Sequence, residues 1–186
     1  MRLFVAVVPP TEVVEELSKF VEPRREHPDD DIRWAAEDHW HITLAFLGDV
    51  PDWKTEELEE RLERAAKRQK PFELQLTGAG AFPGVPDARL LYAGVRDDTG
   101  SLRHLAMTTR AAASRAGVTV EGRKFTPHVT LARLRDASTQ DVADYLSVRG
   151  YFPSRTFMAS RFVLFSSRAS TGGGPYVVED SYALSA

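Results

Sequence analysis

The sequence contains two near copies of one short stretch, His41-Ile42-Thr43-Leu44-Ala45-Phe46 and His128-Val129-Thr130-Leu131-Ala132-Arg133. Their histidines are nearly half of the 186-residue chain apart. In each copy, apolar residues alternating around a β-branched threonine predict a β-strand. Because side chains of a strand alternate between two faces, the histidine and the threonine of each copy share one face. The same polar pair is therefore predicted twice, on two strands that can face each other across a cleft.

Length and composition fit one domain over residues 1–186, made of two lobes that share a core. The chain has no cysteine, which excludes disulfides, cysteine zinc sites and cysteine nucleophiles and fits a reducing cytoplasm. The apolar run 3–8 is too short to span a membrane and lacks the layout of a cleavable signal. We therefore expect a cytoplasmic protein without a membrane segment.

Charge is spread unevenly along the chain. The net charge of −3 gives no overall attraction to nucleic acid. Residues 121–170, however, carry 8 Lys and Arg against 4 Asp and Glu, and they surround the second motif. A local basic surface beside His128 would suit a substrate that carries phosphate. Scattered, solvated arginines are the alternative interpretation.

The remaining periodicity predicts an α+β fold. Helices are expected over 12–26, 53–70, 100–116 and 140–148, and strands over 3–8, 32–35, 72–77, 90–95, 125–134, 161–166 and 176–184, with the first motif strand ending at 48–49. Thr11 is expected to cap the first helix, residues 118–120 to begin a strand, and 29–31, 78–87 and 170–174 to form loops. Each half places a His-x-Thr strand near a helix. We therefore predict a bilobal, pseudo-twofold fold with largely antiparallel sheets, helices on their flanks and a central cleft between the motif strands.

Two histidines facing one cleft can divide acid and base work. An imidazole has an ordinary pKa of about 6.5, so one ring can be neutral while its partner is protonated, and the two titrate as a coupled pair. The hydroxyls of Thr43 and Thr130 can donate hydrogen bonds to oxygens on phosphorus. A phosphodiester fits this set, because one histidine can deprotonate the attacking oxygen while the other protonates the departing one.

That chemistry needs no metal or other cofactor. The chain has five histidines, and no His-Glu-x-x-His or carboxylate-rich ligand set lies near the motifs. A metal centre built on two histidines is the weaker alternative.

Arg133 and Phe46 each lie five residues after a motif histidine. Strict alternation would point both side chains away from the cleft, unless each strand ends or forms a bulge there. In that case Arg133 could hold phosphate in a bidentate contact and Phe46 could stack on a base. Packing in the core is the alternative for Phe46.

The repeated His-[Ile/Val]-Thr-Leu resembles the paired signature of the 2H phosphoesterase superfamily, and most closely its RNA 2′,3′-cyclic phosphodiesterase branch, often labelled 2′-5′ RNA ligases. The resemblance extends along the chain. It includes Arg2 to Ala6, Trp34, His41 to Gly48, Gly80 to Pro83, Arg123, Phe125, Pro127, Arg161 to Leu164 and the glycine-rich turn before Tyr176.

The resemblance implies metal-free hydrolysis of a 2′,3′-cyclic phosphate to a 2′-phosphomonoester. We expect the protein to act as a monomer, on RNA ends or small cyclic nucleotides. It also implies that His41 and His128 are the acid–base pair, that Thr43, Thr130 and Arg133 bind phosphate, and that Phe46 stacks on a base. We prefer His41 as the acid for the leaving 3′ oxygen and His128 as the base for water, although the near symmetry of the motifs leaves the reverse open. Arg123, upstream of His128, is a candidate contact to flanking phosphates.

The family's usual Asn-Leu before the first motif is His39-Trp40 here. We expect His39 to have a surface or rim role rather than to be a third catalytic histidine. Two other functions stay open. One is 2′-5′ ligation, in which a 5′-hydroxyl replaces water and the reaction runs in reverse, and the other is a non-catalytic module that binds RNA ends.

Overall fold

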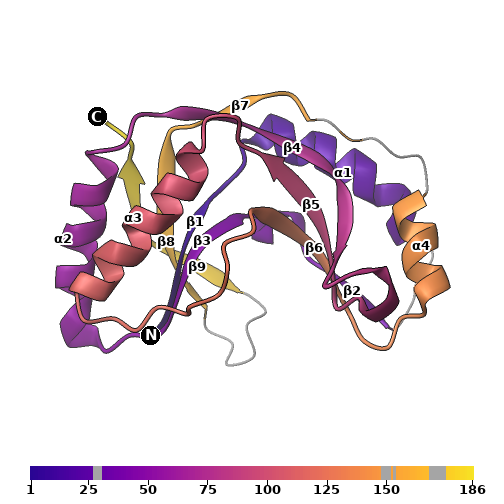
Figure 1. Ribbon diagram of the computed structural model, residues 1–186, viewed down its shortest axis with the longest axis horizontal. Coiled ribbons are helices and arrows are strands. Elements are labelled where there is room, and N and C mark those ends of the chain that lie inside the picture. The colour runs from indigo at the N-terminus through magenta and orange to yellow at the C-terminus, as the bar shows by residue number, and fades with distance from the viewer. Residues whose placement is uncertain (27–30, 148–151, 153, 168–174) are drawn as a thin grey trace.

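The computed structural model describes residues 1–26, 31–147, 152, 154–167 and 175–186 (Figure 1). Its strands are β1 (Arg2–Val7), β2 (Ile32–Trp34), β3 (Ile42–Asp49), β4 (Phe72–Phe82), β5 (Leu90–Arg96), β6 (His128–Leu134), β7 (Phe157–Ala159), β8 (Arg161–Ser167) and β9 (Tyr176–Ala183). Its helices are α1 (Thr11–Arg25), α2 (Thr55–Ala66), α3 (Ser101–Arg115) and α4 (Thr139–Ser147). The predicted α+β class is confirmed.

The strands form one curved sheet in which the two motif strands are neighbours. Its order is β7-β4-β5-β6-β3-β1-β8-β9, and β2 also pairs with β6. All these pairings are antiparallel. Figure 1 shows the sheet as an arch, with β1, β3, β8 and β9 in one half and β2, β4, β5 and β6 in the other. The halves meet where β3 and β6 pair at Ile42 and Val129.

The four helices lie on the flanks of the arch, two for each half (Figure 1). Helix α3 follows β5 in sequence but packs against β3 of the other half, where the Nε of Arg110 donates a hydrogen bond to the carbonyl of Leu44 (3.2 Å). Helix α1 follows β1 but lies beside α4, and the Nε of Arg24 donates to the carbonyl of Tyr145 (2.9 Å). The two halves therefore exchange helices. The half with β3 is covered by α3, which follows β5 of the other half, and the half with β5 is covered by α1, which follows β1.

The core lies between the sheet and these helices. Apolar side chains of α2 and α3 that follow the helical repeat are fully buried, among them Leu58, Leu62, Leu102 and Leu105. In the part of the chain that the structure describes, no helix is long and apolar enough to cross a membrane.

Several predicted boundaries were wrong. Strand β4 continues through the expected loop to Phe82, because Gly80 and Ala81 pair with Tyr92 and Leu91 of β5. Residues 118–120 form no strand, and Thr11 is the first residue of α1 rather than its N-cap, a position that Pro10 occupies. The short β7, which pairs with the start of β4, was not predicted.

The second long helix was predicted over 53–70, but α2 is shorter at both ends. A 3-10 turn, Asp52–Lys54, precedes it. The predicted loop 170–174 and two residues of the acidic loop, 29 and 30, lie outside the described residues.

Replacing Ile42 with alanine should destabilise the fold strongly. Its side chain is fully buried (0 % exposed) where the two halves join, and truncating a buried isoleucine to alanine costs about 2 to 5 kcal/mol. Denaturant unfolding measures this loss. Met107→Ala on α3, where the side chain is 64 % exposed, is the matched control and should change the free energy of unfolding by less than about 0.5 kcal/mol. Equal effects of the two substitutions would contradict this assignment of the core.

Candidate active site

The two His-x-Thr pairs lie on one face of the sheet, around the contact between β3 and β6. The pairing of Ile42 with Val129 sets His41 opposite Thr130 and Thr43 opposite His128. Ile42 and Val129 themselves point to the other face, where both are fully buried. Cβ atoms directly opposite each other are about 5 Å apart, and diagonal neighbours such as the two histidines are roughly 7 Å apart. Two imidazoles and two hydroxyls therefore surround one small space.

Backbone carbonyls hold both imidazole rings in the same orientation. The Nδ1 of His41 donates a hydrogen bond to the carbonyl of His39 (2.6 Å), and the Nδ1 of His128 donates to that of Thr126 (2.6 Å). Because a carbonyl oxygen can only accept, Nδ1 carries the proton in each neutral ring. Nε2 is then the nitrogen that remains to exchange a proton with a ligand.

Aromatic rings surround His41 and alter its charge state. Its ring centroid lies 4.9 Å from that of Phe4 and 5.4 Å from that of Tyr176. Burial, its main cause, and electrostatic repulsion from His128 and His39 together lower the pKa of His41 from its ordinary 6.5 to about 4, against the opposing effect of the hydrogen bond to the His39 carbonyl. His41 is thus neutral near pH 7.

A β-bulge in each motif strand brings Phe46 and Arg133 to the cleft. In β3, Ala45 pairs with Val5 and Thr43 with Ala6, so Leu44 is an extra residue. In β6 the same two-against-one pairing leaves Leu131 as the extra residue. Each bulge therefore buries two consecutive residues and restores the cleft face at the next position.

Both residues that follow the bulges line the cleft. The alternative that Phe46 packs in the core is wrong, because its side chain is 45 % exposed. Arg133 is also exposed. The sequence left such bulges open as a possibility, and the register of the sheet contains one in each motif strand.

One cleft of about 630 Å³ contains all seven predicted site residues: His41, Thr43, Phe46, Arg123, His128, Thr130 and Arg133. Arg123 lies at its edge, with a side chain that is 80 % exposed and an Nε 3.2 Å from a carboxylate oxygen of Glu121. His39 also lines the cleft, with its ring 4.8 Å from that of Tyr176.

Sequence reasoning missed several residues of this cleft, including Arg2, Phe4, Arg33 and Tyr176. Arg2 and Phe4 belong to the N-terminal stretch that resembles the family. That resemblance was the feature of the sequence that could have marked them as site residues. No motif marked Arg33, and it reaches the cleft because β2 pairs with β6.

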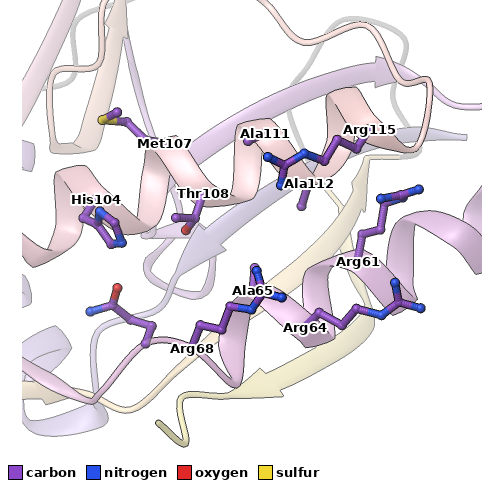
Figure 2. A pocket seen from close by; sticks show the side chains of 11 residues that line it. Arg61, Arg64, Ala65, Arg68, His104, Met107, Thr108, Ala111, Ala112 and Arg115 are labelled. Atoms are coloured by element: carbon purple, nitrogen blue, oxygen red, sulfur yellow. The ribbon is translucent and has the colours of Figure 1, made fainter.

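A second pocket, of about 360 Å³, lies between α2 and α3 (Figure 2). Its lining includes His104 and four arginines, Arg61, Arg64, Arg68 and Arg115. It contains neither motif, and α3 packs against β3 from the flank of the sheet. Both motif histidines therefore belong to the first cleft. Among the described residues, no group of three or more histidine, cysteine or acidic side chains is placed to hold a metal ion.

Comparison with known proteins identifies the family. The model of the 2′-5′ RNA ligase superfamily matches residues 9–171. The chain belongs to that superfamily. A superfamily relative from Escherichia coli, an RNA 2′,3′-cyclic phosphodiesterase, is 33 % identical over 184 residues, which cover 98 % of this chain and 96 % of the relative. A Thermotoga maritima protein of the same name is 30 % identical over 178 residues, covering 96 % and 92 %.

Solved structures share the fold of this chain. TT0787 of Thermus thermophilus superposes with a TM-score of 0.78 at 27 % identity, over 99 % of this chain and 98 % of that one. E. coli LigT in complex with 3′-AMP gives a TM-score of 0.75 at 31 % identity, over 98 % and 97 % of the two chains.

The lowered pKa of His41 makes the stability of the fold depend on pH. An unfolded His41 binds a proton below about pH 6.5, whereas the folded one binds it only near pH 4. The unfolded chain therefore holds more protons in this window, and stability is lost as the pH falls through it. Between pH 7 and pH 5, the original protein should lose about 1 to 2 kcal/mol more than His41→Gln. Denaturant unfolding at both pH values measures this, and equal losses would show that burial does not lower the pKa.

Proposed function

We propose that this protein hydrolyses 2′,3′-cyclic phosphate ends of RNA to 2′-phosphomonoesters by a metal-independent mechanism with two histidines. The observation that carries the proposal is the pair of His-x-Thr strands meeting at Ile42 and Val129 with their polar side chains on one face. The names of the E. coli and T. maritima relatives support an enzyme of the phosphodiesterase type.

In the proposed reaction, water attacks phosphorus while the Nε2 of His128 takes its proton. The bond from phosphorus to the 3′ oxygen breaks, and the protonated Nε2 of His41 donates its proton to that oxygen. The products are a 2′-phosphomonoester and a free 3′-hydroxyl. Thr43 and Thr130 donate hydrogen bonds to the non-bridging oxygens, where fixed donors stabilise the charge that develops in the transition state.

The acid role of His41 requires a proton that burial of the ring disfavours. A bound phosphate supplies a negative charge beside the ring, and such a charge favours the imidazolium. The exposed guanidinium of Arg133 binds the same phosphate and fixes its position. Burial against Phe4 and Tyr176 then keeps water from competing for the proton.

The proposed substrates are RNA ends and small cyclic nucleotides. Phe46 is half-exposed at the cleft and offers a ring on which the terminal base can stack. Arg123 at the cleft edge would contact a flanking phosphate. We propose that residues 1–186 act as one domain and as a monomer, because both halves of one chain contribute to the cleft.

Removing either histidine should abolish most turnover. A general acid or base contributes about 100- to 10,000-fold to a rate, so His41→Ala and His128→Ala should each lower kcat by that range. The assay follows the 2′-phosphomonoester formed from an oligonucleotide that ends in a 2′,3′-cyclic phosphate, with EDTA present throughout.

The same assay separates the alternatives. Full activity in either variant would refute the two-histidine mechanism, and loss of the original protein's activity in EDTA would refute its metal independence. Binding without product would indicate a module that only holds RNA ends. A 2′-5′-linked product, when a strand with a 5′-hydroxyl is added, would indicate ligation.

A substrate with a better leaving group should identify the acid. Replacing the 3′ oxygen by sulfur creates a leaving thiolate that needs no protonation, because a thiol ionises far more readily than an alcohol. His41→Ala should then recover most of its lost activity, whereas His128→Ala should stay inactive. Rates of both variants on the oxygen and sulfur substrates provide the measurement. Recovery of His128→Ala instead would reverse the two roles.

A further inference from the structure

Two arginines lie directly opposite each other at one end of the cleft. Arg33 on β2 pairs in register with Arg133 on β6, and both side chains are exposed. Residues in direct register on antiparallel strands project from the same face. Both arginines line the cleft that contains the motif histidines.

This pairing is electrostatically unfavourable by itself, since like charges directly opposite each other destabilise a sheet. Within the described residues, neither guanidinium has an ion-pair partner; Glu121, which also lines the cleft, is paired with Arg123. Asp31 and Arg135 join the two arginines around a small hollow of about 200 Å³ at this end. Arg133 contacts the reacting phosphate in the proposed function, which leaves the guanidinium of Arg33 to bind a second anion beside it.

The position of the two arginines relative to the motifs suggests which anion they bind. Arg133 follows Thr130 by three residues, one of which is absorbed by the bulge, so the pair lies within roughly 10 Å of Thr130 along the same face. A cyclic phosphate held between the threonines belongs to the last nucleotide of an RNA strand. Its neighbour along the strand is the phosphodiester on the 5′ side of that nucleotide.

We propose that Arg33, beside Arg133, binds this penultimate phosphodiester and so makes the enzyme prefer oligonucleotide ends over free cyclic mononucleotides. This inference rests on the proposed function and specifies its substrate class. Arg33 is a specificity-determining residue, because it contacts a part of the substrate that does not react.

The test compares a dinucleotide and a mononucleoside, each ending in a 2′,3′-cyclic phosphate. Only the dinucleotide carries the second phosphate. Since a hydrogen bond to a charged group contributes about 1.5 to 3 kcal/mol, Arg33→Ala should lower kcat/KM for the dinucleotide roughly tenfold or more, through KM. The mononucleoside should be hydrolysed within about twofold of the original rate, and Arg33→Lys should be intermediate.

Two controls isolate the contact. Arg68→Ala removes the same charge from the second pocket, between α2 and α3 (Figure 2). It should leave kcat/KM for both substrates unchanged. A dinucleotide with an uncharged methylphosphonate linkage should be a poorer substrate for the original protein. Arg33→Ala should lower its turnover no further, because the charge that Arg33 contacts is already gone.

The outcomes distinguish this inference from the function on which it rests. If Arg33→Ala slows both substrates equally, or neither, the original protein is active but Arg33 does not read the second phosphate, and the inference is overturned. If the original protein hydrolyses neither substrate, the proposed function fails and this inference fails with it. Unchanged turnover of the mononucleoside by Arg33→Ala would show that the variant is folded.

Discussion

The structure depends on one backbone contact, the pairing of Ile42 in β3 with Val129 in β6. It joins the two halves of the sheet, and the motif copies lie on either side of it. Both side chains are fully buried on the helix-covered face, so the residues before and after them face the cleft. The hydrophobic effect that buries these two residues therefore also sets the spacing of the two imidazoles. Stability and site geometry have the same origin.

The polar and aromatic surroundings of the site are less symmetric than the motifs. Both histidines donate Nδ1 to a carbonyl two residues earlier in the chain. His41 is enclosed by Phe4 and Tyr176, whereas His128 lies near Phe82 and Tyr92. Near-identical sequence motifs therefore place their imidazole rings in different environments, because the neighbours of each ring come from other strands. Such a difference is what a division into acid and base requires.

Much of this arrangement could be predicted from the sequence. The period-2 pattern placed His41 with Thr43 and His128 with Thr130 on a shared face, and all seven predicted site residues line one cleft. These inferences depend on local periodicity, which a single segment contains in full. The fold class followed from the same patterns and from the family resemblance.

Other features depend on pairing between distant segments and were not predictable in this way. Which residue of each motif forms the bulge is decided by the register with β1 and β5. The Arg33–Arg133 pair joins positions far apart in the chain. The extension of β4 ran through a glycine-rich stretch of poor strand propensity. It forms because the Tyr92 ring packs over Gly80, where a Cβ atom would lie only 2.5 Å from that ring.

The exchange of helices between the halves has a mechanical consequence. Helix α1 is tethered to β1 but anchored beside α4, and α3 is tethered to β5 but anchored on β3. The chain therefore crosses between the two halves of the sheet in both directions, once from β1 to α1 and once from β5 to α3. Spreading the halves apart would pull against both packed helices at once. We therefore expect the cleft to be rigid. A substrate would enter it from its open side, and the two halves would not rotate about a hinge when it binds.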